Sequence, residues 1–354
     1  MDEVIRKRYA RKSAFLEWCD AEGLKVIGGY GVEDLRTAPL ENWDRLGGPA
    51  AYCHLEGSQG FVGAMIGEIP AGKNLKPMHH MYEEQVLILT GRGATQFWSE
   101  GSKDPITLEW QAGSLFSPPI NCKHQHFNGS SQEPVRFVAV NNAPLIVNIF
   151  HSPDFVFDVP YEFKGRFSGQ KDFFSSELKP GELEDRVVNF IPDVDAVQLD
   201  YHPERGIGFS RLGIHLSGNS MVGHIMAIES GTYKKAHQHG PGAQVIVLDG
   251  KGYSLMWPPG GKFVRFDWKR GSLFVPPEGW FHHHFTTSRE AARHLALRRG
   301  LRKVGHPWMP TVSQYEGGHL LEHENEPPEI RAMYEEELKK EGVPLRMPPI
   351  ERRS

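Results

Sequence analysis

The chain contains two copies of one sequence pattern, and this internal repeat constrains its fold more than any other feature. Residues 86–93 have the sequence VLILTGRG, and residues 245–252, 159 positions later, have the sequence VIVLDGKG. The segment GSLFSPP at 113–119 returns as GSLFVPP at 271–277, 158 positions later. An offset that stays nearly constant over so many identities predicts two tandem copies of a single domain.

The repeated segments have the character of short β-strands. Segments such as FVGAMIGEI, QVLILTG and VRFVAV are rich in β-branched and aromatic residues and are separated by Gly, Pro or Asn. This pattern favours a small antiparallel barrel or jelly roll in each copy, with helical patterns only at 3–22 and 327–341. We expect an N-terminal helical or extended cover at 1–49, barrel 1 at 50–150, a connecting segment at 151–204, barrel 2 at 205–300 and a C-terminal extension with a helix at 301–354.

Composition excludes several classes of function. The chain has 40 basic and 44 acidic residues, a net charge of −4, so no basic excess indicates a nucleic-acid partner. Its three cysteines, an odd number without tight spacing, predict neither a disulfide framework nor a thiolate zinc site. The N-terminus lacks the apolar core of a signal peptide, and no apolar run is long enough to span a membrane. We therefore expect a cytoplasmic protein.

Nine of the 18 histidines cluster at corresponding places of the two repeats, at positions 79, 80, 124, 126, 237, 239 and 282–284. His237 and His239 are two residues apart on a predicted strand, so their side chains share one face. His282 and His284 share a face in the same way, whereas His283 points to the other side. Two imidazoles from one strand and a third from another can hold a first-row metal ion, which predicts a site of His237, His239 and His282.

These spacings resemble the two cupin motifs, G(X)5HXH(X)3–4E(X)6G and G(X)5PXG(X)2H(X)3N, present twice in the chain. The chain is therefore similar to a bicupin. This resemblance implies an all-β fold of two tandem cupin barrels (jelly-roll or double-stranded β-helix) with short peripheral helices at both ends. Copy two departs from the motif at Ala243, in place of the acidic ligand, and at Thr286, in place of the final Asn; copy one departs at Met78, in place of the first His, and at Asn121, in place of a Gly.

The two copies keep different subsets of the ligands. Copy one retains His80, Glu84 and His124, two histidines and a carboxylate, a set that suits non-haem Fe(II) with open positions. Copy two retains three histidines and no carboxylate. Three-histidine cupin sites resemble those of gentisate-type dioxygenases, whereas sites with a Glu ligand are more similar to those of oxalate decarboxylases and manganese enzymes.

The resemblance implies, as the first hypothesis, a mononuclear Fe(II) dioxygenase that uses O2 to cleave a C–C bond. Its substrate would be a hydroxylated aromatic or an enolisable small molecule, apolar with a carboxylate or enol. His284 would be the acid/base, and Arg298 would bind the substrate carboxylate. Lys234 and Lys235 are expected to be solvated. His126 and His284 would either be ligands in place of, or beside, His124 and His282, or lie beside the ligands as hydrogen-bond donors or proton relays, which is the favoured alternative.

Two other hypotheses remain open. One is a metal-dependent lyase, decarboxylase or isomerase that uses Mn, Ni or Zn as a Lewis acid, with the Glu84 set carrying the chemistry. The other is a non-enzymatic bicupin that binds a metabolite. On any of these hypotheses we expect a homodimer or higher homo-oligomer, because the edges of β-sheets need cover.

Overall fold

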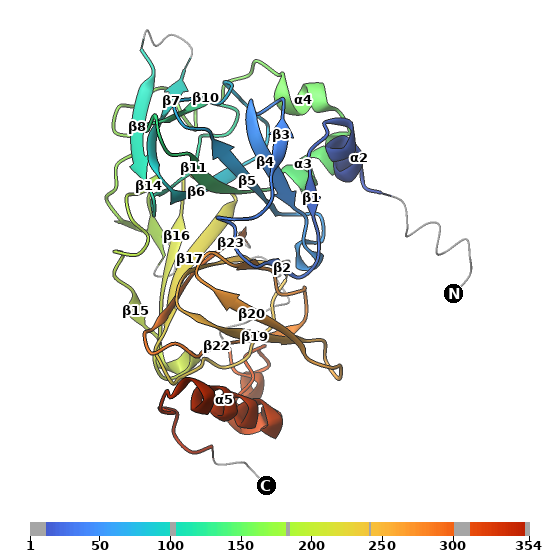
Figure 1. The fold of residues 1–354 in the computed structure, drawn as a ribbon, viewed down its shortest axis with the longest axis vertical. Helices are drawn as coiled ribbons and strands as arrows, with labels where there is room; N and C mark the ends of the chain where they lie inside the picture. Colours follow the sequence, from blue (N-terminus) through green and yellow to red (C-terminus); the bar gives the residue numbers. More distant parts are fainter. Residues whose placement is uncertain (1–11, 100–103, 182–184, 241, 301–311, 351–354) are drawn as a thin grey trace, which may run out of the picture.

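The structure, a computed structural model, describes residues 12–99, 104–181, 185–240, 242–300 and 312–350. These residues form two β-barrels, one above the other in Figure 1, with short helices at the two ends of the molecule. The all-β prediction is therefore confirmed, and the peripheral helices are present at both ends. The parts of the predicted terminal segments at 1–11, 301–311 and 351–354 lie outside the described residues.

Barrel 1 consists of a large sheet that faces a three-stranded sheet. The large sheet comprises β1 (Val26–Ile27), β3 (Glu41–Trp43), β4 (Gly48–Cys53), β5 (Gly63–Ile69), β6 (Glu84–Thr90), β9 (Leu115–Phe116), β11 (Val135–Asn141) and β14 (Phe190–Ile191). The small sheet comprises β7 (Arg92–Trp98), β8 (Ile106–Gln111) and β10 (Lys123–Asn128).

Barrel 2 repeats this arrangement. Its large sheet comprises β2 (Gly31–Val32), β12 (Lys179–Pro180), β13 (Arg186–Val187), β15 (Asp200–Tyr201), β16 (Phe209–His215), β17 (Met221–Ile228), β18 (Gln244–Asp249), β21 (Leu273–Phe274) and β23 (Ala292–Arg299). Its small sheet comprises β19 (Lys251–Trp257), β20 (Val264–Lys269) and β22 (Phe281–Thr286).

Each barrel receives an edge strand from the segment that precedes the other barrel. Strand β2, which lies before barrel 1 in the chain, pairs antiparallel with β21 of barrel 2. Strand β14, which lies before barrel 2, pairs antiparallel with β9 of barrel 1. This exchange covers a sheet edge in both barrels and ties the two repeats together.

The two large sheets pack against each other and bury a shared apolar core. Residues of β5, β6 and β11 from barrel 1 lie in one cluster with residues of β16, β17, β18 and β23 from barrel 2. The strands of the large sheets are thus buried on both faces, which explains their continuous apolar runs. The inner face of each large sheet lines its barrel, where the predicted metal ligands lie.

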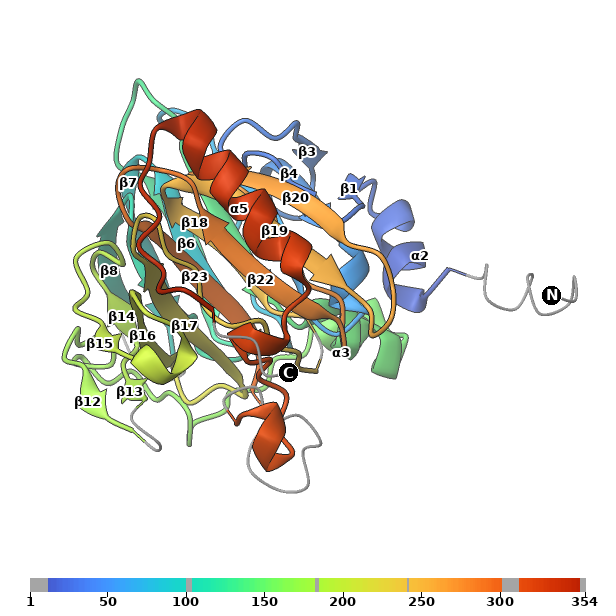
Figure 2. The ribbon, with the colours of Figure 1, turned by 90° about the horizontal axis from the view of Figure 1, so that it is seen from below.

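Helices cover the outer surfaces of the two barrels. Helices α2 (Ala14–Ala21), α3 (Ala143–Phe150) and α4 (Pro153–Phe157) lie beside barrel 1, and α5 (Pro328–Glu341) crosses the small sheet of barrel 2 (Figure 2). Short 3-10 turns are η1 (Glu56–Ser58), η2 (Pro203–Arg205), η3 (Gln314–Glu316) and η4 (His323–Asn325). No helix among the described residues is long and apolar enough to cross a membrane.

Helix α5 is held to barrel 2 by a buried apolar face. Ile330, Tyr334 and Leu338 are buried against Tyr253 and Phe285 of the small sheet. The helix ends at Gly342, whose left-handed backbone (φ 65°) closes the last turn, as the sequence predicts.

Replacing Leu338 by Ala should remove part of this face and leave a cavity under the helix. We expect the free energy of unfolding to fall by about 2–5 kcal/mol, measured by urea denaturation. Lys339→Ala, one residue further and exposed, is the matched control and should change stability little. Equal effects of the two substitutions would contradict the packing described for α5.

Candidate metal centres

In barrel 2 the structure brings together the three histidines that the sequence singles out. His237 and His239 lie on the segment between β17 and β18, and His237 forms a β-bridge with His282 of β22. The ring centroids are 5.5 Å apart for His237 and His239, 4.2 Å for His237 and His282, and 4.8 Å for His239 and His282. One ligand nitrogen from each ring lies within 4.8 Å of the others, and all three rings are buried. We call these residues the histidine triad.

Backbone carbonyls determine which nitrogen faces the centre of the triad. His239 Nδ1 donates to the Gly240 carbonyl oxygen at 2.9 Å, and His282 Nδ1 donates to that of Trp280 at 3.2 Å. A carbonyl oxygen only accepts, so Nδ1 carries the proton and the Nε2 lone pair of each neutral ring remains free. This is the arrangement in which protein imidazoles bind metals, so the donor set fits a divalent ion.

In barrel 1 the structure brings together His80, Glu84 and His124. His80 Nε2 and His124 Nε2 lie 3.3 Å and 3.6 Å from Glu84 Oε1, and all three residues are buried. Their Nδ1 atoms donate to the carbonyl oxygens of Tyr82 and Cys122, both at 2.9 Å. Glu84 Oε2 and His124 Nε2 have no hydrogen-bond partner, which is costly for buried polar atoms and fits a site that holds a cation.

The copies differ at the first histidine position. In barrel 1 that position holds Met78, which forms a β-bridge with His124, just as His237 does with His282. The Met78 side chain packs, partly buried, against the apolar core of barrel 1. Barrel 1 thus replaces one imidazole by an apolar side chain and keeps a carboxylate that barrel 2 lacks.

Burial keeps most of these histidines neutral. Burial, with the nearby His80 ring, lowers the pKa of His124 to about 4, and burial together with Arg298 lowers that of His239 to about 3. For Glu84, burial opposes ionisation, but the facing His80 and His124 rings outweigh it and lower its pKa to about 2. The imidazoles of His124 and His239 are therefore neutral, the form that binds metal, over a wide range of pH.

A hydroxyl group orients His284 beside the triad. Trp268 Nε1 donates to Ser254 Oγ at 3.0 Å, and Ser254 Oγ lies 2.8 Å from His284 Nδ1. Among the described residues the Ser254 hydroxyl has no other acceptor for its proton, so His284 Nδ1 accepts and Nε2 carries the ring proton. A neutral His284 in this tautomer is a hydrogen-bond donor through Nε2, with no free Nε2 lone pair for a metal.

Barrel 1 contains the same arrangement. Trp110 Nε1 donates to Thr95 Oγ1 at 2.8 Å, and Thr95 Oγ1 lies 2.7 Å from His126 Nδ1. The indole, the hydroxyl and the second histidine occupy equivalent positions of the repeat. This arrangement favours the interpretation of His126 and His284 as donors beside the ligands.

Barrel 2 also contains a group of basic side chains near the triad, which we call the basic set: Arg205, Arg211, Lys234 and Arg298. All four act on His224 of β17, whose pKa burial lowers well below its usual value and their charges lower further. Lys234 likewise adds to the lowering of the pKa of His237 and of His282, where burial is the main cause. The basic set therefore surrounds the same interior as the triad.

Lys234 is the most enclosed member of the basic set. Its side chain is 2% exposed, and its Nζ lies 4.0 Å from Met226 Sδ and 5.4 Å from the centre of the Phe209 ring. The prediction that Lys234 is solvated is wrong, because this side chain is buried against Met226 and Phe209 of barrel 2. Lys235 is partly exposed and forms an ion pair with Glu322 at 2.6 Å.

The basic set carries little compensating negative charge. Arg211 lies 3.6 Å from Asp185, whereas Arg205, Lys234 and Arg298 form no ion pair with any described carboxylate. Arg205 Nε is buried without a partner. Arg298, predicted as a substrate-binding residue, is partly buried and close enough to His239 to lower its pKa. Sequence reasoning missed Arg205 and His224, because neither belongs to a motif.

His79 and His283, each next to a predicted ligand in the sequence, lie in different surroundings. His79 is partly buried, and its Nδ1 lies 3.1 Å from Asn121 Oδ1. His283 is fully buried on the outer side of β22, where it lies against Tyr233 and 3.9 Å from Glu326 of the C-terminal extension. His283 is therefore part of the contact between barrel 2 and that extension.

The comparisons with known proteins identify the fold. No family model and no curated protein matches the chain. A structure of oxalate decarboxylase, described for its substrate binding mode and a reaction specificity switch, matches with a TM-score of 0.52 and 12% identity over 78% of this chain and 79% of that one. A variant of Bacillus subtilis oxalate decarboxylase matches with a TM-score of 0.51 and 13% identity over the same shares. The fold is that of a bicupin, with two candidate metal centres.

The expectation of a dioxygenase, and so of an oxidoreductase, is wrong. The solved structures compared above are oxalate decarboxylases, which are lyases, and they do not support a gentisate-type pattern, iron or O2. The physical reason is that three imidazoles define where a metal binds but not which reaction follows, because one barrel supports many chemistries.

The stability of the metal-free protein should fall as the pH is lowered. His124, His126, His239 and His294 have pKa values of about 3 to 4 in the folded chain and near 6.5 when unfolded. Below pH 6.5 the unfolded chain therefore takes up protons that the folded chain does not, and each histidine costs up to about 1.4 kcal/mol per pH unit. Urea denaturation of EDTA-treated protein between pH 7.5 and 5 measures this slope.

The matched variant for this experiment is His294→Phe. Strand register places His294 of β23 opposite Met226, and the equivalent residue of barrel 1 is Phe137, opposite Gly67. In this variant the free energy of unfolding should depend less steeply on pH, because one histidine fewer takes up a proton on unfolding. A stability that stays constant or rises as the pH falls would contradict the burial of neutral histidines.

Replacing Ser254 by Ala should allow His284 to adopt either of its two neutral tautomers. Without the hydroxyl, His284 Nδ1 has no donor and Trp268 Nε1 has no acceptor, at a cost of about 1–3 kcal/mol in stability. We expect the ¹⁵N NMR shifts of the His284 ring to show a mixture of tautomers, while Thr95→Val, the equivalent change in barrel 1, leaves them unchanged. A His284 ring that keeps its proton on Nε2 in Ser254→Ala would show that the hydroxyl does not determine the tautomer.

Proposed function

We propose that the chain is a metal-dependent lyase that decarboxylates a small carboxylate anion inside barrel 2. The observation that carries this proposal is the basic set, which buries positive charge beside the histidine triad without an equal negative charge. Burial and the neighbouring Arg205 and Arg211 lower the pKa of Lys234 well below its usual value, so a bound anion would stabilise the charged form of this side chain. The metal candidates are Mn, Ni and Zn.

The interior of barrel 2 suits a carboxylate for electrostatic reasons. A divalent ion held by His237, His239 and His282 would supply Lewis-acid charge to a bound carboxylate. Lys234 and Arg298 would bind and orient the anion through charge-assisted hydrogen bonds, which are strong where water is excluded. The triad itself has no carboxylate, so nothing in the first set of ligands repels the substrate.

In the proposed reaction the C–C bond next to a carboxylate breaks and CO2 leaves. The electron pair of that bond stays on the remaining carbon, which then takes up a proton. His284 carries a proton on Nε2, and its ring centroid lies 5.6 Å from that of His282, so we assign this atom to hydrogen-bond the bound carboxylate, while the proton that the carbon takes up comes from water. Oxalate, the substrate named for the structural neighbours, would give CO2 and formate.

Barrel 1 is the other place where lyase chemistry was expected, because it retains Glu84. The main charges that act on Glu84, His124 and His126 are those of Glu84 and the neighbouring histidines, so this interior offers a carboxylate rather than a buried lysine or arginine to an incoming anion. This difference in charge favours barrel 2 as the place where an anionic substrate reacts.

The test is CO2 release from a panel of small carboxylates, beginning with oxalate, by protein loaded with Mn, Ni or Zn. Lys234→Met should lower kcat/KM by about 10- to 100-fold, because it removes a hydrogen bond to a charged group. Lys235→Met, whose ammonium pairs with Glu322, is the matched control and should remain active.

Substitution of the ligands distinguishes the two barrels. His237→Ala should abolish CO2 release, whereas His80→Ala should retain much of it. The reverse pattern would place the chemistry in barrel 1, and no CO2 release from any carboxylate at full metal occupancy would reject the lyase proposal.

A further inference from the structure

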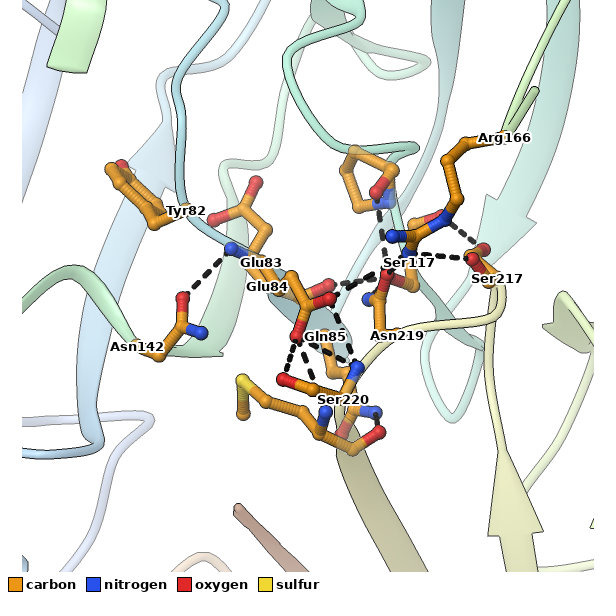
Figure 3. A network of polar contacts seen from close by, with 12 residues as sticks. Tyr82, Glu83, Glu84, Gln85, Ser117, Asn142, Arg166, Ser217, Asn219 and Ser220 are labelled. Atoms are coloured by element: carbon orange, nitrogen blue, oxygen red, sulfur yellow. Dashed lines mark hydrogen bonds and ion pairs between the residues drawn. The ribbon is translucent and has the colours of Figure 1, made fainter. Parts of the chain in front are cut away.

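A buried glutamate joins the metal-binding strand of barrel 1 to barrel 2. Glu83 is 6% exposed and precedes β6, and its carboxylate reaches the turn between β16 and β17 (Figure 3). Both carboxylate oxygens accept from Ser220 N at 2.9 Å, and Oε2 also accepts from Ser220 Oγ at 2.6 Å and from Met221 N at 3.2 Å. Arg166 Nη2 lies 3.6 Å from Oε1 and neutralises the charge.

The two residues that follow Glu83 are tied to the same turn. The carbonyl oxygen of Glu84 accepts from Ser117 Oγ at 2.5 Å, and that hydroxyl oxygen accepts from Asn219 Nδ2 at 2.7 Å. Gln85 Nε2 donates to the carbonyl oxygen of Met221 at 3.3 Å. Three successive residues at the start of β6, one of them a predicted metal ligand, are therefore held by barrel 2.

The repeat shows which of these contacts is general and which belongs to barrel 1. Gln244, the equivalent of Gln85, donates to the carbonyl oxygen of Val62, the equivalent of Met221, also at 3.3 Å. The glutamate contact has no such counterpart, because Gly242 occupies the position of Glu83. A Cβ at Gly242 would lie 2.2 Å from the Gly57 carbonyl oxygen, so no side chain fits there.

The copy that lacks an acidic ligand thus also lacks the glutamate before it. Barrel 1 has Glu83 and Glu84 where barrel 2 has Gly242 and Ala243. Among the residues that the structure describes, the Glu84 carboxylate makes polar contacts with the two histidines of its own set, and its Oε2 has no hydrogen-bond partner. Its position therefore depends on the main chain at the start of β6, which Glu83 and its partners hold in place.

We propose that Glu83 is a positioning residue for the metal ligand Glu84, so that the turn at 217–221 of barrel 2 determines the metal affinity of barrel 1. Partners of this kind, which hold a ligand without touching the metal, commonly change metal affinity by about 10- to 100-fold. The inference rests on the proposed metal centre of barrel 1 and does not depend on the lyase activity of barrel 2.

The experiment measures Mn(II) binding by EPR titration of the full chain. The background carries His237→Ala and His239→Ala, so that barrel 1 is the remaining candidate centre. Adding Glu83→Gln should weaken Mn(II) binding about tenfold or more, and Ser220→Ala, which removes one of the hydrogen bonds from the other side, should weaken it by a smaller factor. The EPR spectrum of bound Mn(II) should also change in Glu83→Gln, because a displaced Glu84 alters the ligand field.

Gln244→Met is the matched control, because it breaks the equivalent interface contact in the copy without an acidic ligand. It should lower the Tm and leave Mn(II) binding unchanged. If Glu83→Gln lowers the Tm in the same way and binds Mn(II) like its background, the positioning role is rejected; if Glu83→Gln does not fold, Ser220→Ala decides alone. A background that binds no Mn(II) overturns both the centre of barrel 1 and the role of Glu83, while the proposal for barrel 2 stands.

Discussion

Uncompensated positive charge inside barrel 2 is the constraint on which the functional account depends. Lys234 is almost fully buried, Arg205 Nε has no partner, and Arg298 forms no ion pair with any described carboxylate. Such an interior costs free energy in the absence of an anion, because desolvated cations repel each other and the metal that the triad would hold. On the proposed function, this loss of stability accompanies a site that would favour a negatively charged substrate.

The two barrels have diverged from one framework in a consistent direction. Both keep the indole–hydroxyl–histidine arrangement and the interface glutamine, which belong to the framework itself. Barrel 1 has kept a carboxylate ligand together with the glutamate that fixes its strand to the partner barrel. Barrel 2 has neither of these and contains buried basic side chains and a further buried histidine, His294. Barrel 1 therefore has a carboxylate ligand that would neutralise part of a metal's charge, whereas the candidate centre of barrel 2 has only neutral ligands and lies near basic side chains.

Much of the fold and of both ligand sets could be predicted from the sequence, because the repeat and the alternation of strand residues are local signals. The grouping of His237 and His239 followed from their spacing alone. The burial of Lys234 and His283 could not be predicted, because it depends on how distant segments close over each barrel. The pairing of β2 with barrel 2 and of β14 with barrel 1 could not be predicted either, because two-residue strands leave no periodic pattern in the sequence. The predicted reaction class was wrong, because the metal ligands do not specify which reaction the metal supports.

The most direct test of the account is anomalous X-ray diffraction from crystals of the manganese-loaded protein soaked with a small carboxylate. The account predicts a metal peak between His237, His239 and His282, with the carboxylate bound at the metal and in contact with Lys234 or Arg298. A barrel 2 without a metal peak, or a carboxylate bound away from these residues, would contradict it.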